Sequence, residues 1–354
     1  MKILTGIWQW LGGPRLNTII TALTSLFGPI GLAIIATMGT LWLGWKIRRF
    51  WKRDKNPYTP HNPVTPPLFV GREKLLRDLA NALERKESIS LVGDRRIGKT
   101  SVLETWQQQV QAQNRLVIYV SGENAEAKDL SQFIKKITKQ RASDDPEDAA
   151  NVLSEWAEEQ TKATGYPPLI LVDEAERFIA KFPPRFFERL RGMLERVVWI
   201  FASRSYIDEV YKKFHHETSP FENRLALHQL GLLEQNAADQ LIKLGRLTPE
   251  ETELMHTWAG RHPFFLQLLG KSLLAGRGES AQRALDEFQT EANRRLKRVW
   301  DTLKDTEQTA LKHCLEGKPA ELRSLRVRGL VTEQGQLFGK VLETWLIEYN
   351  GSGD

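Results

Sequence analysis

The stretch GDRRIGKTS, from Gly93 to Ser101, decides the fold that this sequence predicts. It follows the phosphate-binding loop pattern G-x-x-x-x-G-K-[ST], in which backbone amides surround a triphosphate. The apolar run SISLV (residues 88–92) precedes it and a helix-like segment (residues 100–111) follows it. This order of strand, loop and helix is typical of a nucleotide-binding loop, so we expect ATP as the ligand. The alternative, a chance glycine-rich turn before a helix, does not account for the flanking segments.

The residues of this loop have distinct expected roles. Lys99 is predicted to contact the β- and γ-phosphates, and the Thr100 hydroxyl is predicted to bind Mg²⁺. The predicted cofactor-binding residues of the loop are Gly93, Asp94, Arg95, Arg96, Ile97, Gly98, Lys99, Thr100 and Ser101.

A second motif, LILVDE from Leu169 to Glu174, is typical of a buried parallel strand that ends in two carboxylates. Asp173 is predicted to bind Mg²⁺ with Thr100, while Glu174 polarises the water that attacks the γ-phosphate. The two acids could instead cap the following helix, and the two roles are compatible. The sequence therefore predicts an Mg²⁺-dependent ATPase in which Lys99 and Glu174 are catalytic.

Apolar strand-like runs alternate with helical periodicity from Phe69 to about Leu230. The runs occupy residues 88–92, 115–122, 169–174, 197–204 and 224–230. This order predicts an α/β P-loop fold with a mainly parallel five-stranded sheet. Short amphipathic helices after Leu232 predict an all-α lid. From about Ser280, three helices and a small hairpin suggest a winged helix.

The N-terminal stretch has a different composition, because residues 16–45 contain no charged side chain. Its centre is apolar enough to cross a bilayer of about 30 Å, and it is longer than the apolar part of a cleaved signal peptide, about 7 to 15 residues. We expect one transmembrane helix at residues 18–45. Gly28, Pro29 and Gly31 leave a kink or a re-entrant hairpin as the alternative.

Flanking charge predicts the orientation of this span. Six Lys and Arg residues lie between residues 46 and 55, against Lys2 and Arg15 before the span. The positive-inside rule then gives a single-pass protein of the cell membrane with its ATPase body in the cytoplasm. Outside residues 1–55 the chain carries 42 basic and 43 acidic side chains, so its overall charge gives no argument for nucleic acid.

Five prolines lie in the segment KNPYTPHNPVTPP (residues 55–67), which favours extended backbone. We expect a semi-rigid stalk there, with a disordered tether as the alternative. The predicted domains are an N-terminal interfacial segment (1–17), the transmembrane helix (18–45), a basic juxtamembrane and Pro-rich stalk (46–67), the P-loop ATPase core (68–231), the helical lid (232–279) and the winged-helix domain (280–354).

Several further motifs allow a comparison with a known family. They are FVGREKLLRDL (69–79), ASR (202–204), SPFENRLALHQLGLLEQNAADQLI (219–242), GRHPFFLQLLG (260–270), RGLV (328–331) and ETWL (343–346). With the two nucleotide motifs, they make the chain resemble a STAND-type or archaeal-type P-loop ATPase of the AAA+ (ASCE) branch. The resemblance covers roughly residues 69–349. The loop and DE motifs are specific for P-loop ATPases in general, and the others narrow the branch only moderately.

The resemblance implies roles for four further residues. Arg72 is expected near the nucleotide, Arg204 is expected to sense the γ-phosphate, and His262 with Pro263 is expected to close the lid over the base or phosphates. Arg204 at a strand end beside the loop could also stabilise charge on the phosphates on chemical grounds alone. The alternatives are a surface ion pair for Arg204 and a plain helix start at His262-Pro263.

These features favour a membrane-anchored ATP switch, in signalling or defence, that forms an ATP-dependent homo-oligomer and acts on an unknown protein partner. Candidate trans-acting arginines are Arg185, Arg189 and Arg191. The alternative function is a DNA-binding ATPase that reads DNA through its winged helix. Its candidate contacts are Arg323, Arg326 and Arg328, supported by Arg294, Arg295, Lys297 and Arg298. A protein-remodelling machine is disfavoured because the sequence shows no pore-loop aromatic motif.

Overall fold

The computed structural model describes residues 56–123, 129–276 and 280–351. The chain divides at Asn56 into two units, and the fold described below is that of the second, Pro57–Asp354. The predicted interfacial segment and transmembrane helix, at residues 1–17 and 18–45, lie outside the described residues. Among the helices of the described ranges, none combines the length and apolarity needed to cross a membrane.

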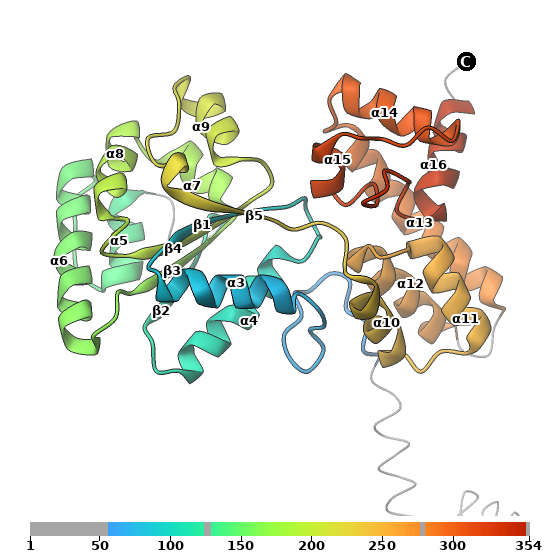
Figure 1. Cartoon of the computed structure of the whole chain (residues 1–354), viewed down its shortest axis with the longest axis horizontal. Coiled ribbons are helices and arrows are strands. Elements are labelled where there is room, and N and C mark those ends of the chain that lie inside the picture. Colours follow the sequence, from blue (N-terminus) through green and yellow to red (C-terminus); the bar gives the residue numbers. More distant parts are fainter. Residues whose placement is uncertain (1–55, 124–128, 277–279, 352–354) are drawn as a thin grey trace, which may run out of the picture. The chain divides into compact units, whose positions relative to one another are not determined.

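A five-stranded parallel sheet forms the centre of the ATPase core (Figure 1). Its strands are β1 (Ser88–Val92), β2 (Val117–Ser121), β3 (Leu169–Asp173), β4 (Val198–Ser203) and β5 (Leu225–Gln229), in the order β2-β3-β4-β1-β5. Each strand falls within a predicted apolar run, so the predicted parallel sheet is confirmed. The pairings Val92 with Ser203 and Ser121 with Asp173 bring the carboxyl ends of the strands to one edge.

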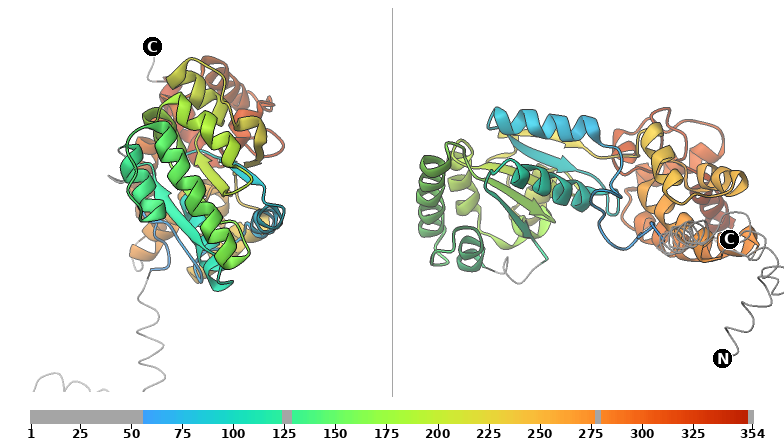
Figure 2. Two further views of the ribbon diagram at one scale, coloured as in Figure 1. Left: turned by 90° about the vertical axis from the view of Figure 1, so that its left-hand side faces the viewer. Right: turned by 90° about the horizontal axis from the view of Figure 1, so that it is seen from below.

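Helices cover both faces of this sheet (Figure 2). Leu169 and Leu171 of β3 belong to the hydrophobic cluster on one face, and Ile170 and Val172 belong to the cluster on the other. The first face packs against α3 (Glu73–Glu84) and α4 (Lys99–Ala112). The second packs against α5 (Leu130–Thr138), α6 (Pro146–Thr164), α7 (Ala175–Lys181), α8 (Pro184–Met193) and α9 (Ile207–His215). Burial on both faces explains why β3 is continuously apolar.

The chain after β5 is helical, as predicted for the lid. Its elements are α10 (Gln235–Leu244), α11 (Pro249–Leu254), a π-helical turn (Met255–Ala259) and α12 (Pro263–Ala275). The last part contains α13 (Ala281–Trp300), α14 (Asp305–Leu315), α15 (Arg323–Val327) and α16 (Lys340–Gly351). All of these helices contribute to one hydrophobic cluster, in which Phe265 of α12 contacts Phe288 of α13.

The predicted hairpin wing is much reduced. Within residues 280–351 no strand forms, and Val331 and Leu337 make a single antiparallel bridge. Gly335 donates its amide to Thr332 O, so the segment is a tight turn. A winged helix in the strict sense therefore stays a prediction for this region.

Residues 57–64, which we call the strap, pack on the body of the protein. This differs from the extended stalk that we predicted for this part of the chain. The Tyr58 side chain is 2% exposed and its hydroxyl donates to Ile242 O at 2.9 Å. A Cβ atom added to Gly245 or to Gly270 would lie 2.4 Å from Tyr58 atoms. Two glycines 25 positions apart in the lid thus leave the space that the tyrosine fills.

We expect Tyr58→Ala to lower the free energy of unfolding by about 3 kcal/mol, because it leaves a cavity in the lid and removes a buried hydrogen bond. Urea unfolding followed by tryptophan fluorescence measures the change. Tyr166→Ala is the matched control, since Tyr166 is 50% exposed and its ring lies against the Arg115 guanidinium. Its expected loss is below about 1 kcal/mol. Equal losses in the two variants would contradict the anchoring role of Tyr58.

Candidate nucleotide site

The loop from Gly93 to Gly98 joins β1 to the start of α4. The Gly93 amide donates to Ser203 O of β4 at 3.1 Å, which fixes the beginning of the loop on the neighbouring strand. Gly98 has φ 107°, a left-handed conformation that glycine adopts without a steric penalty. The residues of the first turn of α4 line the cavity beside the loop, and the first amides of a helix have no partner within the helix. A helix start of this kind is a binding site for phosphate.

Lys99 is buried inside the loop. Its Nζ donates to Gly93 O at 2.7 Å and to Asp94 O at 3.0 Å. Burial lowers the pKa of the ammonium group, and the carboxylates of Glu176, Asp173, Asp94 and Glu174 act in the opposite direction. The loop therefore holds a buried cation beside the phosphate-binding amides.

Asp173, the last residue of β3, forms a buried polar centre with residues from two other elements. Its Oδ2 accepts hydrogen bonds from Thr100 Oγ1 at 2.7 Å and from the Tyr119 hydroxyl at 2.8 Å. Burial and the nearby Asp173 raise the pKa of Tyr119, which keeps this phenol protonated as a donor. A carboxylate and a hydroxyl this close together are suitable ligands for Mg²⁺, which prefers oxygen.

Glu174 is the N-cap residue of α7, with φ 52° and ψ 48°, an uncommon backbone conformation for a residue other than glycine. Its Oε2 lies 2.9 Å from Arg204 Nη2. Arg204 Nε also lies 3.1 Å from Glu176 Oε1, an ion pair without hydrogen-bond alignment, and neither oxygen of this buried carboxylate has a hydrogen-bond partner among the described residues. Burial raises the pKa of Glu176. Arg204, just after β4, thus bridges two carboxylates that follow the neighbouring strand β3.

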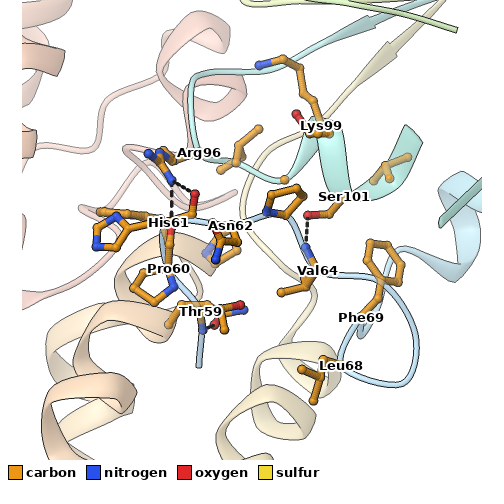
Figure 3. Close-up of a pocket in the computed structure, with 18 of the residues that line it drawn as sticks. Thr59, Pro60, His61, Asn62, Val64, Leu68, Phe69, Arg96, Lys99 and Ser101 are labelled. Carbon is orange, nitrogen blue, oxygen red and sulfur yellow. Dashed lines mark hydrogen bonds between the residues drawn. The ribbon is translucent and has the colours of Figure 1, made fainter. Parts of the chain in front are cut away.

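A cavity of about 330 Å³ lies beside the loop and is lined from three parts of the chain (Figure 3). The strap crosses it. Arg96 Nη1 donates to Pro60 O at 3.0 Å and to His61 O at 2.9 Å, and Val64 N donates to Ser101 Oγ at 3.0 Å. Thr59 N donates to Gln267 Oε1 of the lid at 2.7 Å. The strap therefore connects the lid to the phosphate-binding loop and forms one wall of the cavity.

The family resemblance implied that Arg72 lies near the nucleotide. Arg72 lines the cavity, but its guanidinium donates to Gly231 O and Leu232 O, at the connection between core and lid. Burial lowers the pKa of Arg72 to about 10. Its observed contacts are therefore those of a residue that holds the start of the lid.

His262 and Pro263 form the start of α12, which was the simpler of the two interpretations. His262 Nδ1 accepts from the Phe264 amide, and its ring packs against Phe265 and Phe338. Complete burial lowers the pKa of His262 to about 3, so the ring is neutral. Pro263 lines the cavity, while the His262 side chain points into the hydrophobic core of the lid.

The basic residues assigned to a DNA contact are partly engaged within the chain. Arg323 Nε donates to Gln229 Oε1 at 3.1 Å. Arg328 pairs with Asp94 at 3.4 Å and with Glu307 at 3.2 Å. These intrachain contacts give no support to a DNA-reading surface on α15.

Three residues of this region were not predicted as site residues from the sequence. Tyr119 lies on β2 and binds Asp173, and Glu176 faces Arg204 and Lys99. Glu176 could have been predicted as a site residue, because it lies two positions after Glu174 in the sequence. Arg295 of α13, assigned only to a DNA surface, donates its Nη2 to Arg95 O of the loop at 2.7 Å.

Comparisons with known proteins agree with this geometry. Residues 68–204 match the sequence family described as AAA ATPase domain. The chain is similar in structure to the Walker-type ATPase PABY2304 of Pyrococcus abyssi, with a TM-score of 0.56 and 15% identity over 81% of this chain and 99% of that one. At that identity the likeness shows the fold alone.

Two further structures resemble the chain more distantly. The ORC1 protein of Aeropyrum pernix, solved in complex with DNA, has a TM-score of 0.42 and 15% identity, over 80% of this chain and 94% of that one. Cdc6p of Pyrobaculum aerophilum has a TM-score of 0.43 and 13% identity, over 84% of this chain and 98% of that one. Among curated protein sequences none matches. The sheet order and the loop geometry are those of a P-loop nucleotide-binding fold, and residues 68–204 are similar in sequence to the AAA ATPase domain.

Proposed function

We propose that this protein is a membrane-anchored, ATP-binding and ATP-hydrolysing switch whose nucleotide state controls its conformation and assembly. The observation that carries the proposal is the 2.7 Å contact between Thr100 Oγ1 and Asp173 Oδ2, with Lys99 and Glu174 beside the same cavity. Loop, hydroxyl and carboxylates come together from β1, α4 and β3 as phosphoryl transfer requires.

The proposed roles follow from the contacts. The amides at the start of α4 and the Lys99 ammonium bind the β- and γ-phosphates. Thr100 and Asp173 would hold Mg²⁺, which neutralises charge on the phosphate oxygens when bound. Glu174 accepts a proton from the attacking water, and Arg204 stabilises charge on the γ-phosphate. The strap and the lid shield the cavity from bulk water.

Direct contacts between the loop and the C-terminal helices support a conformational switch. Arg328, just after α15, pairs with Asp94, and Arg72 ties the start of α3 to the first residues of the lid. A conformational change at the phosphate-binding loop is thereby transmitted to the lid and to the C-terminal helices. In the sequence the strap directly follows residues 1–56, which contain the predicted membrane segment. Signalling or defence through a protein partner is the role that such an arrangement suits.

Assembly is the part of the proposal that a mass measurement tests. We expect the Glu174→Gln protein in detergent to form a discrete larger species with Mg-ATP, as measured by light scattering, because it binds ATP and hydrolyses it slowly. Lys99→Ala, which lacks the phosphate contact, is the matched control and should keep its nucleotide-free mass. An unchanged mass while ATP is bound would contradict ATP-dependent assembly.

A trans-acting arginine has candidates on α8. Arg185 Nη2 lies 3.0 Å from Glu147 Oε2, and Arg189 pairs with the same carboxylate. Both side chains are exposed and reach the surface next to α6. If Mg-ATP builds an oligomer, Arg185, Arg189 and Arg191 are the first residues to replace.

A further inference from the structure

Tyr119 reaches the end of the neighbouring strand from the middle of β2. The strands β2 and β3 run in parallel, with Tyr119 beside Leu171 and Ser121 beside Asp173. Alternation along the strands places Tyr119 and Asp173 on the same face of the sheet, the one covered by α3 and α4. The phenol extends forward along the sheet, and its hydroxyl donates to Asp173 Oδ2 at 2.8 Å. Tyr119 therefore contacts a proposed Mg²⁺ ligand from an edge strand.

Three hydrogen bonds hold the Asp173 carboxylate. Its Oδ2 accepts from Thr100 Oγ1 at 2.7 Å and from Tyr119, while its Oδ1 accepts from the Glu174 amide at 3.0 Å. Because both oxygens are held, the plane of the carboxylate is defined as well as its position. The two side-chain donors are neutral hydroxyl groups, so they orient this buried carboxylate without cancelling the charge that a cation would meet.

Thr100 and Tyr119 differ in what else they can contact. The described residues that line the cavity of about 330 Å³ include Thr100 and Asp173 but not Tyr119. Thr100 also belongs to the first turn of α4, so its position depends on what the phosphate-binding loop binds. Tyr119 belongs to the sheet and packs against the hydrophobic cluster on this face. Tyr119 is thus the donor that does not touch the nucleotide, and it can influence the site only through Asp173.

We propose that Tyr119 is a positioning residue that fixes the orientation of Asp173 and so makes the site formed by Thr100 and Asp173 selective for Mg²⁺ over Ca²⁺. This inference rests on the proposed function, because it requires these two residues to hold the divalent cation that accompanies ATP. Mg²⁺ demands near-ideal octahedral geometry, whereas Ca²⁺ accepts variable arrangements of oxygen ligands. A carboxylate with a fixed plane therefore favours the smaller ion. Groups that orient a metal ligand commonly change metal affinity by about 10- to 100-fold.

Packing is the other contribution that Tyr119 makes, because its ring lies against the hydrophobic cluster that includes Leu103 of α4 and Leu171 of β3. Tyr119→Phe keeps the ring and removes only the hydroxyl, so it preserves this packing and deletes the hydrogen bond to Asp173. Among the described residues, Thr100 is then the one side-chain donor left to Asp173 Oδ2. The substitution therefore separates the orientation of Asp173 from the stability of the sheet.

The test compares the affinity for a nonhydrolysable ATP analogue in Mg²⁺, in Ca²⁺ and in EDTA, by calorimetry on the full chain in detergent. The ratio of the affinities with and without a cation isolates the contribution of that cation. For Tyr119→Phe we expect the ratio for Mg²⁺ to fall about tenfold and the ratio for Ca²⁺ to fall less than about threefold. The affinity in EDTA should be unchanged, because Tyr119 does not line the cavity.

Tyr206→Phe is the matched control. Tyr206 is the N-cap residue of α9, and its hydroxyl also takes part in a hydrogen bond, which it accepts from Gln229 Nε2 at 2.6 Å. This hydrogen bond involves neither of the proposed Mg²⁺ ligands. The control variant should therefore keep all three affinities of the wild type.

The outcomes separate this inference from the proposed function. A wild-type protein that binds no analogue, or binds it equally with and without Mg²⁺, would refute both. If the wild type responds to Mg²⁺, an unchanged Mg²⁺ ratio in Tyr119→Phe overturns the inference alone, even where the affinity falls equally in all three solutions. An equal fall of the Mg²⁺ and Ca²⁺ ratios overturns it as well. If Tyr119→Phe fails to fold, Tyr119→Ile replaces it with the same expectation, since isoleucine favours strands and its side chain donates no hydrogen bond.

Discussion

Glu174→Gln is expected to bind Mg-ATP with nearly unchanged affinity and to hydrolyse it about 10² to 10⁴ times more slowly, the usual contribution of a general base. The amide has nearly the same shape as the carboxylate but cannot accept a proton from water. It can still accept a hydrogen bond from Arg204, whose Nη2 lies 2.9 Å from Glu174 Oε2. Binding is measured by calorimetry and hydrolysis by phosphate release.

The control for this variant is Glu123→Gln. Glu123 also lines the main cavity, but it follows β2, is half-exposed and pairs with Arg177. Its loss should leave hydrolysis within about twofold, the range expected for an exposed ion pair. Normal turnover by Glu174→Gln would refute the assignment of the base. A loss of ATP binding in that variant would instead place Glu174 in the binding site.

Lys99→Ala is expected to lower the affinity for ATP by about 100-fold or more, so that binding is abolished at micromolar concentrations. The ammonium group is the only cation held by the Gly93 and Asp94 carbonyls in the described part of the loop. Without it, phosphate charge would meet Asp173, Glu174 and Glu176 with less compensation. Titration with a fluorescent ATP analogue measures the loss.

The fold of the Lys99→Ala protein should remain intact, because the ammonium is buried and its desolvation opposes folding. A thermal unfolding midpoint close to that of the wild type would verify this. Lys74→Ala provides the matched control, because Lys74 is an exposed residue of α3 that does not line the cavity, and this variant should bind ATP normally. Retention of ATP affinity in Lys99→Ala would contradict the whole site.

Local sequence patterns predicted the sheet, and they singled out Thr100 and Asp173, which the structure brings into contact. A parallel strand that is covered on both faces is apolar along its whole length. The strands β1, β3 and β4 could therefore be predicted without knowing which strands lie beside them. The phosphate-binding loop and the Asp173-Glu174 pair could be predicted from the sequence for a related reason. Their chemistry depends on residues next to one another in the chain and on strand ends that the parallel topology brings together.

Residues that contact the site from parts of the chain far away in the sequence could not be predicted in this way. Tyr119 resembles any aromatic residue of a strand until β2 is known to lie beside β3. The prolines of the strap predicted an extended stalk, but the segment turns at Thr59–Asn62 and packs on the body of the protein. Composition does not reveal what a segment packs against. The space for Tyr58 depends on Gly245 and Gly270, which belong to different parts of the lid.

The strap also has a consequence for where the functional domain begins. The family match starts at residue 68, yet Pro60, His61 and Val64 line the cavity and contact the phosphate-binding loop or α4. Tyr58 anchors the same segment in the lid. A chain cut at the family boundary would keep every residue of the phosphate loop and lose a wall of its pocket. The boundary of the family match and the boundary of the packed domain therefore differ by about ten residues.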